Sequence, residues 1–278
     1  MFFVLTTNFI LVIFNSFQAL ADYDYKNPDS WSVEHAECYG RMQSPIDIDL
    51  FVNSGQQHWY NNLVFFNYHE LPTMAKLLND GHTLKIEFEW NHFAPQIHGG
   101  PLHDVYQLEN LHFHWNTNHH SGSEHKINGE SFPLEMHMVH FNRRYNSYSN
   151  ALNYRDGLAV VAVMFALSSE DQSLLLSKIL ANSSEVTNKY SNIHIQPFRP
   201  HMFLNEGIFQ NYAVYFGSLT TPPCTEGVAW FVSLQPLPVS TTEMHKFRSL
   251  QLANNDDHNN RPIQPRNGRS INIIESYF

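Results

Sequence analysis

The chain has 278 residues, 42% of them hydrophobic and 14% aromatic, which is enough for one large domain with a sizeable core. Its formal net charge of −10 argues against nucleic acid as a partner, because nucleic-acid binding requires a basic surface. No internal repeat, low-complexity linker or composition shift marks a second domain, so we expect a single one.

The first 21 residues have the composition of a cleaved signal peptide. Phe9–Phe14 is an unbroken apolar run, and Ala19-Leu20-Ala21 matches the small-residue pattern of a cleavage site. The segment has no Lys or Arg and is short for a membrane span, so an uncleaved anchor is the lesser alternative. We therefore expect a secreted protein whose mature chain is 22–278, with no transmembrane span in it.

The chain has only two cysteines, Cys38 and Cys224. In an exported protein a lone pair favours a disulfide, and two unpaired thiols are the alternative. Asn182-Ser183-Ser184 is a glycosylation sequon, for which we expect a helix end or a loop.

Strand patterns begin after the turn sequence Asn79-Asp80-Gly81. Leu84, Ile86 and Phe88 alternate with charged residues, which predicts a half-buried strand. Leu111, Phe113 and Trp115 alternate with two histidines in the same way, so the histidines face away from an apolar, core-packed face.

Two short segments carry three histidines at a spacing typical of a metal site. His112 and His114 share one face of a strand, and His137 lies in a second segment further along the chain. On adjacent antiparallel strands the three imidazoles would leave a fourth position open, as catalytic zinc requires. Because the chain has 18 histidines, ordinary hydrogen-bonded imidazoles remain the alternative. Glu135 shares the face of His137 and can accept its second ring N–H, which favours zinc.

The rest of the chain adds two central strands and two helices. The apolar runs Leu158–Ala166 and Val228–Val232 predict buried strands. A helix is expected from Ser169 to Leu180, and Ser240 with Glu243 forms a capping-box pattern before a second helix. We expect one mainly β domain with short peripheral helices and long loops.

Six separate motifs occur in order between about Trp31 and the C-terminus. They are Gln43-Ser44-Pro45-Ile46, Asn79-Asp80-Gly81-His82, His112-Phe113-His114-Trp115, Ser123-Glu124-His125, Glu135-Met136-His137 and Ser218-Leu219-Thr220-Thr221-Pro222-Pro223. Together they make the chain resemble an alpha-class carbonic anhydrase of the secreted type. One such motif would be weak evidence, but all six in order are specific.

The resemblance implies a ten-stranded, mostly antiparallel twisted sheet with one zinc ion at the base of a conical cleft. It assigns His112, His114 and His137 as zinc ligands, with Asn110 and Glu135 as partners of the ligand rings. Thr220 would donate its hydroxyl proton to Glu124, since an ionised carboxylate can only accept. The implied reaction is the reversible hydration of carbon dioxide to bicarbonate and a proton, by attack of zinc-bound hydroxide.

The resemblance also assigns the surroundings of the zinc. His82 would be the proton shuttle, because imidazole titrates near neutral pH. Cys38 and Cys224 match the disulfide of secreted members, which would brace the loop that carries Thr220. An apolar wall would hold carbon dioxide, formed by Val139, Val160, Leu219, Val228 and Trp230.

Several positions depart from the family pattern, among them Asn110 and Val33. Asn110 stands where Gln is common, and its shorter side chain predicts a hydrogen bond to His112 that is longer or bridged by water. Val33 stands where many members have a Tyr near the cleft.

Two other function classes stay open. A non-catalytic binding module on the same fold typically loses a zinc histidine, whereas this chain keeps all three. An extracellular zinc-binding or matrix protein using the surplus histidines would hold several metal ions, whereas an enzyme would hold one. We expect a monomer, because nothing in the sequence marks a self-complementary patch.

Overall fold

The computed structural model describes residues 23–51, 61–168, 174–204 and 208–275. The expected signal peptide, 1–21, lies outside the described residues, as does the expected start of the helix at Ser169. Among the described residues, no helix has both the length and the apolar character needed to cross a membrane.

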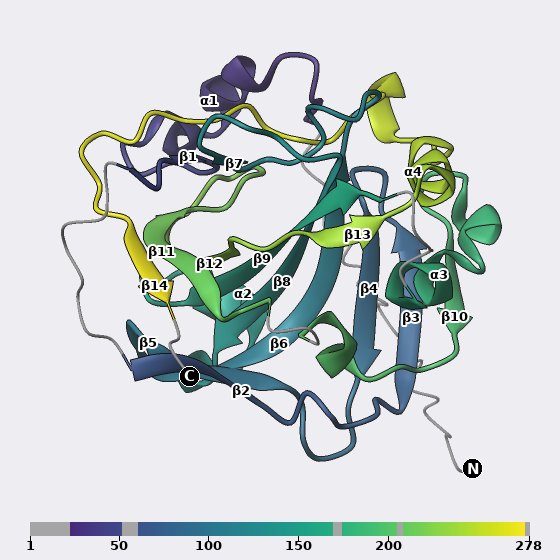
Figure 1. Ribbon diagram of the computed structural model, residues 1–278, viewed down its shortest axis with the longest axis horizontal. Coiled ribbons are helices and arrows are strands. Elements are labelled where there is room, and N and C mark those ends of the chain that lie inside the picture. The colour runs from purple at the N-terminus through teal and green to yellow at the C-terminus, as the bar shows by residue number, and fades with distance from the viewer. Residues whose placement is uncertain (1–22, 52–60, 169–173, 205–207, 276–278) are drawn as a thin grey trace, which may run out of the picture.

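A 12-stranded sheet dominates the described structure, and β1 and β7 form a separate two-stranded pair (Figure 1). Along the main path the strand order is β10-β3-β4-β6-β8-β9-β12-β11-β14. The sheet is mostly antiparallel, with parallel pairing of β9 to β12 and β13. The strands are β1 (Asp47–Ile48), β2 (Asn61–Phe66), β3 (Met74–Asn79), β4 (Leu84–Glu89), β5 (Gln96–Gly100), β6 (Leu102–Trp115), β7 (Lys126–Ile127), β8 (Leu134–Asn142), β9 (Leu158–Leu167), β10 (Asn192–Ile195), β11 (Asn211–Ser218), β12 (Glu226–Ser233), β13 (Leu237–Val239) and β14 (Asn272–Glu275).

The main sheet has two strands more than the ten that the resemblance implied. β6 and β9 each pair with two strands along one edge. The second partner, β5 for β6 and β13 for β9, lies off the main path. β6 pairs with β4 near its end and with β5 near its start, and β9 pairs with β12 and then β13. The mainly β class with short helices is confirmed.

The helices are short, as expected. The capping box is confirmed, because the Ser240 side chain accepts the Glu243 N–H and Glu243 accepts the Ser240 N–H. Asn182 follows the end of α3, which confirms its setting at a helix end. Residues 28–34 form one short 3-10 helix followed by one short α-helix. The helices are α1 (Trp31–Glu34), α2 (Tyr148–Ala151), α3 (Leu174–Leu180), α4 (Thr241–Arg248), and the 3-10 helices η1 (Pro28–Ser30), η2 (Ala36–Tyr39), η3 (Arg143–Tyr145), η4 (Ser183–Val186), η5 (Pro200–Phe203) and η7 (Ala253–Asn255).

The two faces of the sheet bury different apolar clusters because side chains alternate along each strand. Leu111, Phe113 and Trp115 of β6 belong to the larger cluster, which includes residues of α3 and α4. Val139 of β8 and Trp230 of β12 belong to the second cluster on the opposite face. The histidines of β6 alternate with the first set, so they lie on the face of the second cluster.

Candidate metal centre

Three imidazoles meet where β6 and β8 pair. The strands are antiparallel and place His112 opposite His137, while His114 lies two residues along β6 on the same face. One ring nitrogen from each residue lies within 4.8 Å of the other two. His114 and His137 are each only 1% exposed. The expected triangle of imidazoles therefore forms at the pairing of two strands.

Each ring uses one nitrogen for a hydrogen bond, which leaves the other nitrogen for a metal. His112 Nδ1 lies 3.0 Å from Asn110 Oδ1, and His114 Nδ1 donates to the Asn259 carbonyl at 2.7 Å. His137 Nε2 donates to Glu135 Oε1 at 2.6 Å. The remaining atoms are Nε2 of His112 and His114 and Nδ1 of His137, and His114 Nε2 is buried without a partner among the described residues. Three neutral nitrogen donors suit zinc.

Burial keeps the three rings uncharged. Burial lowers the pKa of His114 to about 3, and it lowers the pKa of His112 well below its usual value. It also lowers the pKa of His137, although Glu135 opposes the change. Neutral imidazoles keep a free lone pair, and this lone pair is the group that binds a metal.

Glu135 fixes the orientation of the third ring through a buried network. Its Oε1 also accepts from His125 Nδ1 at 2.7 Å, and its Oε2 accepts the backbone N–H groups of Glu124 and His125 at 2.8 Å. Burial would raise the pKa of this carboxyl, but the histidines outweigh burial and hold the pKa well below its usual value. The network continues from His125 Nε2 to the Tyr215 hydroxyl at 2.6 Å and on to Ser44 at 2.8 Å.

Glu124 and Thr220 lie beside the histidines. Glu124 is 1% exposed, and its Oε1 accepts the Arg261 backbone N–H at 2.8 Å. Burial and the nearby Glu135 raise the pKa of the Glu124 carboxyl, and the Arg261 N–H and the Thr220 hydroxyl lower it. Thr220 thus lies next to Glu124, as the resemblance implies.

The predicted disulfide between Cys38 and Cys224 is confirmed, with an S–S distance of 2.03 Å. It joins η2 to the loop after β11 that carries Thr220.

A cavity of about 360 Å³ opens above the three histidines. Polar lining residues come from the β3–β4 turn, β4 and β6, here called the polar wall, and apolar ones come from β8, β9, β12 and the loop after β11, here called the apolar wall. Four of the five predicted apolar residues line the cavity. The polar residues include Asp80, His82, Thr83, Lys85 and Asn110, and the apolar residues include Val139, Val160, Leu219 and Trp230.

Two expectations about this cavity are wrong. Val228 shares a face of β12 with Trp230 but lies further along the strand, where it lines a smaller hollow with Leu152 and Leu158 and not this cavity. Val33 is 85% exposed on α1 and does not line it either. Tyr23 and Tyr25 line the cavity, together with Tyr148 and Trp230.

His82 lies on the polar wall, on the turn between β3 and β4. Its ring stacks on Tyr23, with 4.1 Å between ring centroids and an interplanar angle of 11°. The Asp80 side chain accepts the His82 N–H at 2.9 Å, which holds the turn. The histidine is 7% exposed.

Sequence reasoning missed four residues at this site: Tyr23, Tyr25, Asn259 and Arg261. Asn259 holds the His114 ring through its carbonyl and accepts the Trp115 N–H with its side chain at 2.7 Å. All four lie in segments without regular strand or helix periodicity, so no pattern identified them.

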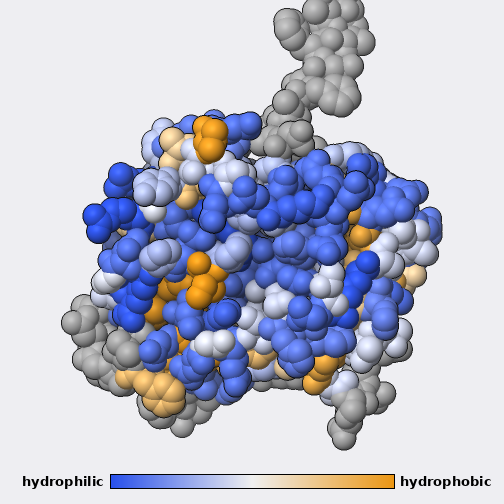
Figure 2. Space-filling view, turned by 90° about the horizontal axis from the view of Figure 1, so that it is seen from above, coloured by the Kyte–Doolittle hydropathy of each residue, from blue (hydrophilic) through white to orange (hydrophobic). Residues whose placement is uncertain are grey.

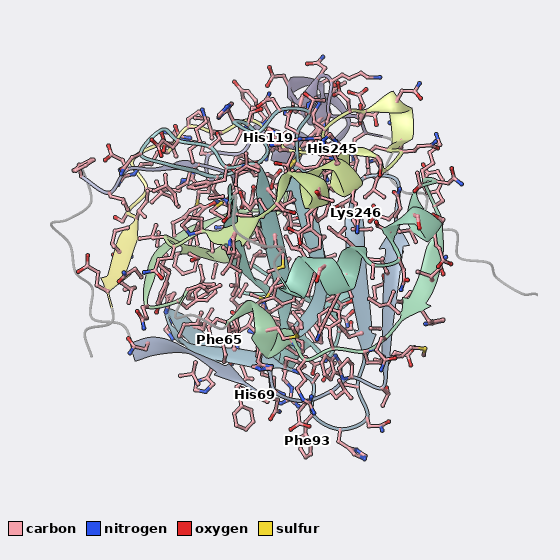
Figure 3. The ribbon with its side chains drawn as sticks, turned by 45° about the vertical axis from the view of Figure 1, so that its right-hand side comes forward. Phe65, His69, Phe93, His119, His245 and Lys246 are labelled. Carbon is pink, nitrogen blue, oxygen red and sulfur yellow. A yellow bond between two sulfur atoms is a disulfide. The ribbon has the colours of Figure 1, made fainter. Side chains whose placement is uncertain are left out.

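The surplus histidines do not form a separate metal group in the part of the chain that the structure describes. The two groups of potential ligands found there both contain His137. His69 lies at one end of the molecule and His119 and His245 at the other (Figure 3).

A sequence model described as eukaryotic-type carbonic anhydrase matches residues 26–275. Carbonic anhydrase 7 of Mus musculus is 34% identical over 251 residues, covering 88% of this chain and 92% of the relative. Carbonic anhydrase 7 of Homo sapiens is 34% identical over 253 residues, with the same coverage.

Proposed function

The chain belongs to the eukaryotic-type carbonic anhydrase family and is a carbonate dehydratase, and we propose that it hydrates carbon dioxide reversibly with one zinc ion held by His112, His114 and His137. The observation that carries the proposal is the set of three ring nitrogens within 4.8 Å at the base of the cavity. Two come from one strand and one from its neighbour, so the fold itself holds the ligands in place.

The donor set fits catalytic zinc because three protein ligands leave a fourth position open toward the cavity. When bound, zinc in carbonic anhydrases lowers the pKa of a coordinated water to about 7, a known property of the family and not a result of this structure. Asn110, Asn259 and Glu135 orient the three rings, and such partners commonly change metal affinity or activity tenfold or more.

Glu124 and Thr220 orient the reacting oxygen in this proposal. The Arg261 N–H binds one oxygen of the carboxylate. Thr220 would donate its hydroxyl proton to the same carboxylate, which fits the lowering effect of Thr220 on the pKa of Glu124. The Thr220 oxygen is then free only to accept, so it holds the nucleophile with a lone pair directed at the substrate. Burial raises the pKa of Glu124, whereas a bound dication nearby favours its ionised form.

The apolar and polar lining residues have different roles in this proposal: substrate binding and proton transfer. Carbon dioxide is apolar and binds against Val139, Val160, Leu219 and Trp230, where little water competes with it. His82 on the polar wall carries the released proton toward solvent, because an imidazole can both accept and donate at neutral pH.

Carbon dioxide hydration by residues 22–278, followed with a pH indicator in a stopped-flow instrument, tests this function. We expect fast hydration that a chelator abolishes and one equivalent of zinc restores. A folded protein that holds one zinc without activity would instead be a binding module. Several tight metal equivalents per chain would favour the zinc-binding or matrix protein.

We also propose that the protein is exported after cleavage near residue 21 and acts outside the cell as a monomer. The disulfide supports this, because disulfides persist in oxidising compartments. Expression of the whole chain in a secreting host tests it, with the N-terminus read by mass spectrometry, the Asn182 glycan by a glycosidase shift and the mass by light scattering. An N-terminus at Met1 in the intracellular fraction would contradict export.

A further inference from the structure

A second cavity lies between the N-terminal and C-terminal segments, apart from the metal centre. Its volume is about 590 Å³, and its lining includes Cys38, Arg41, Gln43 and Arg261. In Figure 1 the purple segment around α1 and the yellow C-terminal stretch run near each other here, and hydrogen bonds from Arg261 to Cys38 and Gln43 join them. None of the three histidines of the metal centre lines this cavity.

The guanidinium of Arg261 is buried in the wall of this cavity with part of its hydrogen-bonding capacity unused. The residue is 3% exposed. Nη1 donates to Gln43 Oε1 at 2.9 Å and to the Ser44 carbonyl at 2.8 Å, and Nη2 donates to the Cys38 carbonyl at 3.3 Å. Nε is buried and has no acceptor among the described residues. One N–H of Nη2 and the N–H of Nε therefore have no acceptor among the described residues, and these two nitrogens share one edge of the group.

The carboxylates of Glu124 and Asp29 act on the charge of Arg261, but within the described ranges neither is hydrogen-bonded to its guanidinium. The three acceptors of its guanidinium are two carbonyls and an amide, all neutral, and Trp31 covers one face at 5.5 Å. A buried cation of this kind favours an anion beside it, and a guanidinium edge matches a planar group with two oxygens. The exposed Arg41 adds a second positive charge to the same cavity.

We propose that this cavity is a second anion site, where Arg261 binds the planar CO₂⁻ group of bicarbonate or of a small carboxylate through Nε–H and Nη2–H. The site is distinct from the metal centre and does not depend on the proposed reaction.

Two contacts connect the site to the catalytic loop. The Arg261 backbone N–H binds Glu124 at 2.8 Å, and Gln43, which accepts from the guanidinium, donates to the Cys224 carbonyl at 3.2 Å. Occupancy should therefore also shift the backbone amide resonances of 220–224.

The test is a nuclear magnetic resonance titration of zinc-loaded, ¹⁵N-labelled residues 22–278. Sodium formate and sodium bicarbonate are added in separate arms, with sodium chloride at equal ionic strength as the third. We expect the Arg261 Nε–H resonance to move with saturation in formate, bicarbonate or both, and not in chloride. Movement in bicarbonate, with or without formate, assigns bicarbonate as a ligand, and movement in formate alone assigns a carboxylate. The Arg199 Nε–H already donates to the His69 carbonyl at 2.8 Å and serves as the unmoved internal control.

Variants of two lining residues distinguish anion binding at this site from nonspecific electrostatic attraction. Asp29 is an exposed carboxylate in the cavity, so Asp29→Asn should lower the apparent Kd for formate at least twofold. Arg41→Gln should raise it at least twofold, and Arg199→Gln, which removes a distant cation, should leave it unchanged. Neither cavity variant removes a buried group, so both should fold. An Arg261 Nε–H that does not saturate in either arm would overturn the proposal. A resonance that moves on Asp29→Asn but with neither formate nor bicarbonate would overturn it too, because Asp29 would then be the internal partner.

Discussion

Asn110 shows how the reach of one side chain depends on the backbone around it. The sequence predicted a longer or water-bridged bond to His112, but the structure has a direct contact of 3.0 Å. The pairing of β6 with β8 shifts register between Leu108 and Asn110 and leaves Glu109 without a partner. Such an irregularity changes the direction of the neighbouring side chain.

The contact predicts a graded effect on zinc affinity. Asn110→Ala should weaken zinc binding about tenfold, because His112 loses the group that orients its ring. Asn110→Gln, which keeps the acceptor, should stay within about threefold. Competition with a chromophoric chelator measures both, and an unchanged affinity in the alanine variant would show that the bond is not needed.

Thr220 offers a test of the proposed orienting role. Thr220→Val keeps the shape but removes the hydroxyl, so kcat/KM for hydration should fall on the order of 100-fold, as expected when a reactant loses its alignment. Thr220→Ser keeps the donor and should retain most of the rate. Zinc content should be unchanged in both, measured by metal analysis. Full activity in the valine variant would exclude the role.

At the scale of elements, the turn between β3 and β4 is held by one carboxylate. Asp80 Oδ1 accepts the His82 and Thr83 N–H groups at 2.9 Å each, and Oδ2 pairs with Lys85 Nζ at 2.7 Å. Burial would raise the pKa of Asp80, but Lys85 and the backbone donors outweigh it and lower the pKa. The same turn carries His82, so the stability of the turn affects the position of His82 in the cavity.

The lowered pKa of Asp80 predicts a pH-dependent contribution to stability. Its ionised form stabilises the folded state above the ordinary value of 3.8, and this contribution disappears as the pH falls through the folded pKa. Asp80→Asn should therefore lower the free energy of unfolding by about 1 kcal/mol at pH 7 and by clearly less at pH 3. Urea unfolding at the two pH values measures the difference.

The neighbouring ion pair is a matched control for this prediction. Lys76 and Glu87 pair across the same two strands at 3.3 Å, but their side chains are 36% and 46% exposed. Glu87→Gln should cost less than about 0.5 kcal/mol at either pH, because solvent screens an exposed pair. A loss in Asp80→Asn that is equal at both pH values would mean that charge does not stabilise the turn.

At the scale of the whole molecule, the disulfide closes most of the chain into one loop. Its cysteines are 186 residues apart in sequence. The Cys38→Ser, Cys224→Ser double variant should lose about 2–5 kcal/mol of unfolding free energy, since its unfolded chain gains freedom. It should also lose activity, because Cys224 lies next to the loop of Thr220. Denaturant unfolding and stopped-flow hydration test the two effects, and full activity would show that the loop holds its shape alone.

The surface agrees with the composition of the chain. The face seen from above is mostly hydrophilic, and its apolar groups lie in separate spots (Figure 2). This fits the net charge of −10 and a chain that keeps its apolar residues in two clusters on either side of the sheet.

Local patterns determined much of the architecture from sequence. The alternation in β4, the apolar runs of β9 and β12 and the capping box of α4 predicted those elements, because each depends on neighbours a few residues away. The three histidines, Glu135 and the disulfide partners were also identified beforehand, since their residue types carry the chemistry. The strand count was wrong because double pairing along β6 and β9 depends on segments distant in sequence.

The sequence by itself therefore determined the class of fold, the residues able to hold a metal and the pairing of the cysteines. Only the tertiary structure decided which partners orient those residues. Asn259 reaches His114 across 145 positions and Arg261 reaches Glu124 across 137, both from an irregular segment. The tertiary structure also placed Tyr23 against His82 and left Val228 and Val33 outside the lining of the cavity. Such contacts arise from packing between distant segments, and no local periodicity encodes them.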